Sequence, residues 1–373
     1  MKIVGVTLKP LSVLRSYHTI VAAPKRTIPP SDAPPTRSYF VHLQLHTDNG
    51  LVGLGEVSDY EPDSLDVAAL QPKLEDALLG ADPFDLERLT RRNAFGNLVD
   101  CAIDSALYDL QGKSLGVSVT DLVGGRYRDR VLISWVVYIR RPDLVEQEME
   151  AMVGRGFRAF KLKVGLNVDH DDECVGIMRR VAGPGAQIKL DASGAWSVDD
   201  AIANIRRLAR HGLQGVETPT NPRDVDGLSR VSRSVETPII EHVGKDLGYA
   251  LSLARASAVN IFNVATVSAG GLYRAKRLFA IAEAAGIQCL LGSTVELGIG
   301  TAGQLHLAAS NASVSYPSDL IGPAMYVDDF LIQPFTYEDG CLLVPTGPGL
   351  GVEIDPARLE RLEDHLAPED IPN

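Results

Sequence analysis

Short apolar runs that alternate with amphipathic helical segments dominate the chain from about residue 130 onwards. The runs are rich in Val, Ile and Leu and read ISWVVYI, FKLKV, IKLDA, GVETP, PIIEHV, VNIFNVATV and IQCLLGS. Between them lie segments such as VDDAIANIRRLARHG, LGYALSLARAS and YRAKRLFAIAEAAG, which have the spacing of helices with one apolar face. Strands joined by helices pair in parallel, because each crossover returns the chain to the same end of the sheet.

Successive strand–helix units of this kind favour a closed βα barrel over an open sheet. An open, doubly wound sheet is the structural alternative. It lacks support from a dinucleotide-binding motif, because no GxGxxG opens a helix after a strand. The pattern therefore predicts an α/β fold built mainly on a barrel.

The first part of the chain has a different texture. Strand-like stretches cover residues 3–8 and 39–45, and a Pro-rich segment, AAPKRTIPPSDAPPTR, lies between them. Proline removes a backbone donor and fixes φ, so this segment is expected to be a surface loop. After the turn HTDNGLVGLGE, helices are predicted at about 64–79 and 100–115.

These textures predict three parts in the chain. An α+β part is expected at residues 1–125, and the barrel is expected at residues 126–320. The remaining stretch, residues 321–373, is rich in turns with short strands, and we expect it to return towards the first part.

Composition and charge narrow the function. Hydrophobic residues make up 45% of the chain and charged residues 23%, which is typical of a soluble globular enzyme. The formal net charge of −12 argues against nucleic acid or an anionic membrane as a partner, because both reward clustered Lys and Arg. The start, MKIVGVTLKP, lacks the pattern of a secretory signal, and no apolar run approaches the length of a membrane-spanning helix. A cytoplasmic enzyme is expected.

The cysteines indicate no special chemistry. The four of them lie far apart and form no CxxC pair: Cys101, Cys174, Cys289 and Cys341. Neither a zinc nor a redox motif is present, and a disulfide framework is untypical of so long a chain. They are expected to be small buried hydrophobic side chains.

Acidic residues close three successive runs of the predicted barrel. Asp191 lies in IKLDA, Glu217 in GVETP and Glu241 in PIIEHV. Because the C-terminal ends of barrel strands meet at one rim, we expect the three carboxylates to lie together. Such carboxylates repel one another unless a cation lies between them, and a hard divalent ion, Mg²⁺ or Mn²⁺, prefers oxygen ligands. The alternative is that each acid is an unrelated rim residue or ion-pair partner.

Two lysines end the preceding run, FKLKVG. Lys161 and Lys163 are two residues apart on a strand, so their side chains point the same way, towards the expected cation. A lysine beside a dication and a second lysine is expected to have a lowered pKa, which suits a base. The alternative is a lysine pair on the surface of a strand.

The ordered set of motifs resembles the enolase superfamily, in its mandelate racemase and muconate lactonizing enzyme group. The resemblance runs nearly end to end and includes GLVGLGE, AIDSALYDLQGKSLGVSVTDLVGG, FKLKVG, LDASGAW, VETP, AGGLYRAKRLFAIAEAAGI, GSTVELGIGTAGQLHLAAS, DLIGP and DGCLLVPTGPGLGVEID. It implies an N-terminal α+β capping domain over a modified (β/α)₇β barrel.

The resemblance also implies site residues. Mg²⁺ would be held by Asp191, Glu217 and Glu241, with Lys163 as the base and Lys161 supporting it. The enediolate formed from a carboxylate substrate would be stabilised by the cation.

Further residues follow from the same resemblance. Glu296 matches an acid of the family's seventh strand and is expected to orient other groups. The segment with Arg15, Tyr17 and His18 falls where relatives contact the substrate, so Tyr17 and His18 are predicted to bind it. A homo-oligomer, either a dimer or an octamer, is common in this group.

The chain departs from the family's pattern at the sixth strand. Racemases and cycloisomerases of the muconate lactonizing type carry a second lysine there, and counting back from Gly270 and Gly271 places Ala265 at that position. The His–Asp pair of mandelate racemase is missing as well. A two-base proton transfer therefore lacks its second base, which argues against a racemase or epimerase.

The fifth strand departs too. It ends IIEHVGKD, where relatives carry an acidic pair or a Gly–Glu. Asp246 is therefore an alternative to Glu241 as the third ligand. His242 and Lys245 are ionisable neighbours, and His242 is a candidate general acid.

Three functions stay open at this point. The leading one is a Mg²⁺-dependent lyase, a dehydratase, in which Lys163 takes the proton next to a carboxylate and a β-leaving group departs as water. The second is a cycloisomerase that uses the same enediolate without loss of water. The third is a protein that binds a carboxylate without turnover, which Ala265 favours.

Overall fold

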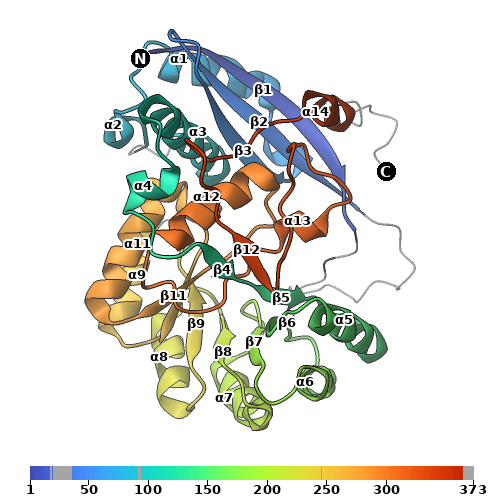
Figure 1. The fold of residues 1–373 in the computed structure, drawn as a ribbon. Coiled ribbons are helices and arrows are strands. Elements are labelled where there is room, and N and C mark those ends of the chain that lie inside the picture. Colours follow the sequence, from blue (N-terminus) through green and yellow to red (C-terminus); the bar gives the residue numbers. More distant parts are fainter. Residues whose placement is uncertain (17–18, 20–35, 91–93, 245, 364–373) are drawn as a thin grey trace.

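The computed structural model describes residues 1–16, 19, 36–90, 94–244 and 246–363 (Figure 1). The predicted substrate contacts Tyr17 and His18, most of the Pro-rich segment and Lys245 lie outside these residues. Among the described residues, no helix combines the length and the apolar character needed to cross a membrane.

A three-stranded antiparallel sheet with helices on one side forms the first part of the structure. Its strands follow one another in chain order: β1 (Ile3–Leu14), β2 (Arg37–Thr47) and β3 (Val52–Tyr60). The helices are η1 (Pro62–Ser64), α1 (Val67–Leu78), α2 (Leu86–Thr90), α3 (Asn97–Leu115) and α4 (Val119–Val123).

Strand β1 is longer than the sequence pattern predicted. We expected it to end at Leu8, before the polar Lys9 and Pro10, but it continues to Leu14. It lies at the edge of the sheet, where a proline costs no ladder hydrogen bond.

Glycines let α3 lie directly on β3. A Cβ at Gly55 would be 2.2 Å from the carbonyl oxygen of Ala102, and one at Gly53 would be 2.4 Å from that of Ala106. Since both contacts are to helix backbone, only glycine fits at this close approach.

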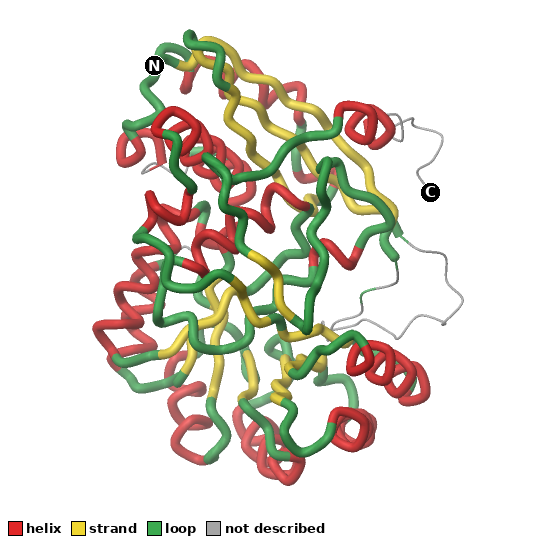
Figure 2. The backbone as a smooth tube through the Cα atoms, in the orientation of Figure 1, coloured by secondary structure: helices red, strands yellow, loops and turns green. Residues whose placement is uncertain are grey.

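A seven-stranded parallel sheet forms the second part, with helices around its outside (Figure 2). Its strands pair in chain order: β5 (Ser134–Val137), β6 (Ala159–Lys163), β7 (Gln187–Asp191), β8 (Gly215–Glu217), β9 (Ile239–His242), β10 (Ile261–Val264) and β11 (Gln288–Leu291). All seven lie in the apolar runs of the sequence, so the prediction of parallel strands is confirmed.

The segment that follows the last strand closes the sheet into a barrel. Val314 forms a parallel bridge to Cys289 of β11, and Ser318 forms one to Ile133, just before β5. An irregular segment thereby takes the eighth position, as expected for a modified (β/α)₇β barrel.

Helices connect successive strands of the barrel, and α12 and α13 follow its last strand, β11. They are α5 (Pro142–Gly154), α6 (Val168–Ala182), α7 (Val198–Leu208), η2 (Ala209–His211), α8 (Val225–Ser234), α9 (Leu247–Arg255), α10 (Thr266–Ala269), α11 (Leu272–Ala285), α12 (Gly298–Ala309) and α13 (Gly322–Met325).

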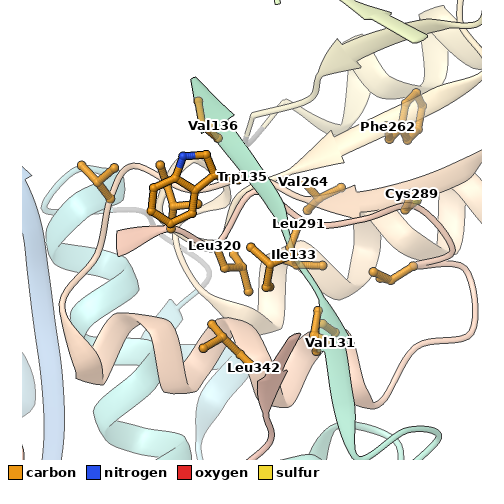
Figure 3. Packing of buried hydrophobic residues seen from close by; sticks show 14 of the residues in the cluster. Val131, Ile133, Trp135, Val136, Phe262, Val264, Cys289, Leu291, Leu320 and Leu342 are labelled. Atoms are coloured by element: carbon orange, nitrogen blue, oxygen red, sulfur yellow. The ribbon is translucent and has the colours of Figure 1, made fainter. Parts of the chain in front are cut away.

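Side chains alternate between the two faces of the barrel sheet. Outward-facing residues such as Phe262 and Val264 of β10 and Leu291 of β11 belong to the large apolar core between sheet and helices (Figure 3). Inward-facing Ile240 and Ile261 pack with Leu290 in a small separate core inside the barrel. The positions inside the barrel nearer the strand ends are polar, and they form the site described below.

The end of the chain returns to the first part. Strand β12 (Cys341–Leu343) pairs with β4 (Arg130–Leu132), and α14 (Pro356–Glu363) lies beside β1 (Figure 1). Lys9 of β1 and Glu363 of α14 form an ion pair of 2.6 Å. The domain boundaries at residues 125 and 320 stay predictions.

Buried carboxylates join the capping sheet and its helices to the barrel. Glu56 of β3 accepts hydrogen bonds from the backbone N–H groups of Leu297 and Gly300, at 2.8 and 2.9 Å. Asp104 of α3 accepts one from the N–H of Leu272, at 2.6 Å. These donors lie at the N-terminal ends of α12 and α11, where helices have unpaired N–H groups. We call Glu56, Asp104 and these helix ends the interdomain joint.

Candidate active site

A cavity of about 360 Å³ lies at the C-terminal end of the barrel strands. It is called the rim pocket below. The ionisable side chains and the one carboxamide in its wall are Tyr138, Lys161, Lys163, Asp191, Glu217, Glu241, His242, Asn263 and Asp319. The three predicted ligand carboxylates and both predicted lysines therefore line one pocket.

Strand register brings the lysines and two of the carboxylates to the same side of the sheet. Lys163 is level with Asp191, and Asp191 is level with Glu217. Nζ of Lys163 lies 2.6 Å from Asp191 Oδ2. Nζ of Lys161 lies 3.0 Å from the same oxygen and 2.9 Å from Glu217 Oε2.

These ion pairs control the protonation of the buried groups. Burial alone would raise the pKa of Asp191, but the ammonium groups of Lys161 and Lys163 hold it well below its usual range. Burial would lower the pKa of Lys161, yet the charges of Asp191, Asp319 and Glu217 raise it well above its usual value. Among the protein's own groups, three carboxylates outweigh the burial of Lys161, while the lowered pKa expected beside a bound dication stays a prediction. A lysine so stabilised in its charged form suits a fixed positive charge rather than a base.

Asp319 and Lys189 complete this charged network, and the sequence analysis missed both. Asp319 lies 2.9 Å from Lys161 and 2.8 Å from Lys189. Lys189 is fully buried and also donates to the carbonyl oxygen of Pro317, at 2.7 Å. Their signals were the strand spacing of Lys189, two residues before Asp191, and the DLIGP motif that contains Asp319.

Strand β9 brings two different groups to the pocket wall. Glu241 is buried, and its Oε1 accepts a hydrogen bond of 3.0 Å from the Tyr249 hydroxyl of α9. Burial, together with the charges of Glu217 and Asp191, raises the pKa of Glu241 to about 8. Burial likewise lowers the pKa of His242.

Asp246 does not reach the pocket. It caps the N-terminus of α9 by accepting from the N–H of Tyr249, and it pairs with Arg223 at 2.9 Å. The prediction of Asp246 as an alternative third ligand is therefore wrong, because its carboxylate caps α9 and pairs with Arg223.

The sixth barrel strand, β10, presents an amide to the pocket. Ala265 is fully buried at the N-cap of α10. Two residues earlier, Asn263 lines the pocket and donates from Nδ2 to Glu217 Oε1 at 2.8 Å. Among the residues that the structure describes, the pocket lining has lysines on β6 and none on β9, β10 or β11.

Glu296 lies behind the pocket wall. It is fully buried and accepts hydrogen bonds from the Ser293 hydroxyl and from the N–H and hydroxyl of Thr294. Ser293 itself lines the pocket. The carboxylate is therefore placed to orient this turn, while its role in the reaction stays a prediction.

Arg15 lies on the capping side, with partners of its own. It pairs with Asp59 at 2.6 Å and donates to the Ser38 hydroxyl at 2.7 Å. These contacts fix the end of β1 next to Tyr326, with which Arg15 forms a backbone bridge.

The donor chemistry of the rim pocket fits a divalent cation. Asp191 and Glu217 supply carboxylate oxygens, and Oε2 of Glu241 is buried without a hydrogen-bond partner among the described residues. In the described part of the chain, no three His, Cys, Asp or Glu side chains lie close enough together to hold a metal ion. The lysine ammonium groups lie against Asp191 and Glu217, so bringing a third ligand to a common ion requires these side chains to move.

A capped βα barrel with lysines and carboxylates at its rim defines a class of acid–base enzymes. Comparison with known proteins identifies the family. The model described as Enolase C-terminal domain-like matches residues 144–358. The model described as Mandelate racemase / muconate lactonizing enzyme, N-terminal domain, matches residues 17–124.

Individual relatives span nearly the whole chain. Muconate cycloisomerase 1-1 of Acinetobacter lwoffii is 32% identical over 335 residues, which cover 86% of this chain and 87% of that protein. The muconate lactonizing enzyme from Pseudomonas fluorescens, solved with muconolactone, is 28% identical with a TM-score of 0.86, covering 97% of this chain and 99% of its own. A dipeptide epimerase from Enterococcus faecalis V583, solved with Mg and L-Leu-L-Tyr, is 27% identical with a TM-score of 0.84, covering 95% and 100%.

The chain therefore belongs to the enolase superfamily, in its mandelate racemase / muconate lactonizing enzyme group, and it is an enzyme of that group. The family and the fold predicted from the sequence are both confirmed.

Proposed function

We propose that this enzyme is a cycloisomerase that moves one proton at the carbon next to a substrate carboxylate, with Lys163 as its single acid–base group. The observation that carries this proposal is that lysines line only one side of the described rim pocket. Lys161 and Lys163 stand on β6, while the described lining from β9, β10 and the turn after β11 carries no lysine; its polar groups are Glu241, His242, Asn263 and Ser293. Inversion at carbon needs a proton carrier on each face of the substrate, whereas ring closure within the substrate needs only one.

The cation is the second part of the proposal. We infer that Asp191 and Glu217, with a group from β9, hold Mg²⁺ or Mn²⁺; from the sequence, that group is Glu241. When bound, the cation would stabilise the negative charge that develops on the substrate carboxylate. The dipeptide epimerase that has the same fold and was solved with Mg supports the choice of cation.

Lys163 transfers the proton. In ring closure, an oxygen of the substrate adds to a carbon–carbon double bond conjugated with the carboxylate, and the electron pair moves towards that carboxylate. The Lys163 ammonium then delivers its proton to the carbon next to the carboxylate, and the amine takes a new proton from solvent. No atom leaves the substrate, so the reaction is an isomerisation.

Lys161 provides positive charge that offsets the carboxylates of the site. Its ammonium lies within 3.0 Å of Asp191, Glu217 and Asp319. Because these carboxylates raise its pKa, Lys161 stays charged during the reaction. We therefore assign Lys161 the role of a fixed positive charge next to the reacting carboxylate.

Dehydration, the leading expectation from the sequence, uses the same Lys163 but needs an acid for the leaving hydroxide. The relatives favour ring closure over loss of water, since a cycloisomerase and a lactonizing enzyme are among them. The reaction class is tested by incubating the enzyme and Mg²⁺ with conjugated dicarboxylates, N-acyl amino acids, dipeptides and hydroxy acids, followed by NMR and mass spectrometry.

The products separate the alternatives. A ring of unchanged mass supports the cycloisomerase. Loss of water with any of these acids would support the dehydratase, and inversion would support an epimerase. Tight binding of a carboxylate without any reaction would support a protein that lost turnover.

A further inference from the structure

We propose that β9 contributes the imidazole of His242, rather than the carboxylate of Glu241, to the divalent cation. This inference rests on the proposed function, since it concerns the third ligand of the same cation. It makes the ligand set two carboxylates and one nitrogen in place of three carboxylates.

The alternation of side chains along the strands carries the inference. On β7, Lys189 and Asp191 face inward while Ile188 and Leu190 belong to the outer apolar core. On β10, Phe262 and Val264 face outward in the same way (Figure 3). Successive side chains of a strand point to opposite faces of the sheet. Once one residue is known to face inward, the directions of the other side chains on that strand follow.

On β9 the inward residue is Ile240. It packs with Ile261 and Leu290 inside the barrel, and it is level with Glu217 of β8. Two residues further along, His242 faces inward again and is level with Asn263, which lines the pocket and binds Glu217. Glu241 lies between these two inward-facing residues, so it points to the opposite face of the sheet, and it is level with the outward-facing Phe262.

Glu241 is held by the helix layer. Its carboxylate accepts from the Tyr249 hydroxyl of α9, a helix on the outside of the barrel. Its side chain therefore leaves β9 on the outer face of the sheet, and one of its carboxylate oxygens is occupied by Tyr249.

His242 has the surroundings of a ligating imidazole. His242 lines the rim pocket together with Asp191 and Glu217. Its Nε2 lies 3.5 Å from the Ser268 hydroxyl, the kind of outer partner that orients a metal-bound histidine. The ring therefore has carboxylates on its pocket side and a hydroxyl contact at Nε2.

An imidazole changes which metal the site prefers. Mg²⁺ takes oxygen ligands almost exclusively, whereas Mn²⁺, which also binds oxygen well, accepts a nitrogen ligand more readily, and imidazole suits Zn²⁺. The enzyme is therefore expected to bind Mn²⁺ more tightly than Mg²⁺ by a larger ratio than its variant H242D, in which all three ligands are oxygens.

The test uses Mn²⁺ as a spectroscopic probe of the full-length enzyme. Protein labelled with ¹⁵N only at histidine is loaded with Mn²⁺, and electron spin echo spectroscopy detects nitrogen directly bound to the metal. We expect a ¹⁵N coupling in the wild type, in E241Q and in the control H46Q, whose histidine lies on β2 in the capping domain. The coupling should be lost in H242Q. Calorimetry gives the affinities of Mg²⁺ and Mn²⁺ for the wild type and H242D.

The outcomes separate this inference from the proposed function. Mn²⁺ bound without histidine coupling in the wild type would overturn the inference and leave the proposed function standing. A ratio of Mn²⁺ to Mg²⁺ affinity that is the same in H242D and the wild type would overturn it too. Failure of the wild type to bind either cation would overturn both. The wild-type spectrum decides the matter even if H242Q does not fold.

Discussion

Two regions of this enzyme bury carboxylates, and they balance the charge in opposite ways. In the rim pocket, Asp191 is paired with two lysine ammonium groups, which hold its pKa well below the usual range. In the interdomain joint, Glu56 and Asp104 bind backbone N–H groups at helix ends, and burial raises the pKa of each to about 7.

The difference separates a chemical role from a structural one. A carboxylate next to a mobile ammonium group can exchange that partner for a cation or a substrate, since both partners are side chains. A carboxylate on backbone N–H groups is fixed by the helix it caps, so it holds domains together. Burial of an acid by itself therefore does not mark a catalytic site in this fold; the type of partner does.

The largest expected effect is on the rim pocket. Lys163→Ala removes the proton carrier, and general acid–base groups contribute factors of about 10²–10⁴ to rates. We therefore expect the turnover rate to fall by that factor while the fold and the Mn²⁺ affinity persist. Steady-state kinetics and calorimetry measure both. The exposed Lys276→Ala on α11 is the matched control, and equal activity of the two variants would remove Lys163 from the mechanism.

The next effect concerns the interdomain joint and its dependence on pH. The pKa of Glu56 rises from 4.5 to about 7 on folding, which corresponds to about 3 kcal/mol. Because its folded-state pKa is raised, its stabilising contribution is complete below pH 4.5 and is lost as the pH rises through 7.

The glutamine side chain of the variant Glu56→Gln cannot titrate. The free energy of unfolding of this variant should therefore decrease less than that of the wild type between pH 5 and pH 8. The decrease in unfolding free energy of the wild type is expected to exceed that of the variant by up to about 3 kcal/mol. Urea denaturation at both pH values measures it. Parallel pH profiles would mean that Glu56 does not titrate in this range.

A smaller effect is expected inside the capping domain. Gly55→Ala places a Cβ against the carbonyl oxygen of Ala102, and such overpacking costs about 1–3 kcal/mol. The activity of the folded fraction should not change, because the substitution is remote from the rim pocket. Thermal unfolding compares it with Gly154→Ala, where no atom lies within 4 Å of the new Cβ. A Gly55→Ala protein as stable as the control would contradict the close approach of α3.

The smallest effect is expected for an ion pair that belongs to neither region. Arg180 and Glu146 pair at 2.7 Å on the barrel surface, and both side chains are largely in water. Exposed pairs of this kind contribute less than about 1 kcal/mol, so Arg180→Ala should leave stability and activity nearly unchanged. A larger loss of stability in urea denaturation would show that charge pairing matters outside the two regions as well.

Much of this architecture could be predicted from the sequence. Apolar runs mark all seven barrel strands, because each buries an outward face beneath a helix. The position of Lys163, Asp191 and Glu217 at strand ends also follows from the runs, since parallel strands end at one rim.

The missed residues depend on information that a sequence pattern does not carry. Asp319 follows an irregular segment that meets the barrel only when the sheet closes, so no periodicity marks it. Glu241 and His242 are adjacent, and only the register of β9 against its neighbours decides which of them faces inward. The end of β1 was missed because a proline is tolerated at a sheet edge.

Proton exchange at the carbon next to the substrate carboxylate tests the central claim most directly. With a substrate identified, NMR in D₂O would follow deuterium at that carbon for the cation-loaded wild type, for Lys163→Ala, and for the wild type after chelation. The account predicts incorporation of one deuterium by the loaded wild type, and loss of incorporation in the other two samples. Incorporation that continues at the wild-type rate without Lys163 or without the cation would contradict it.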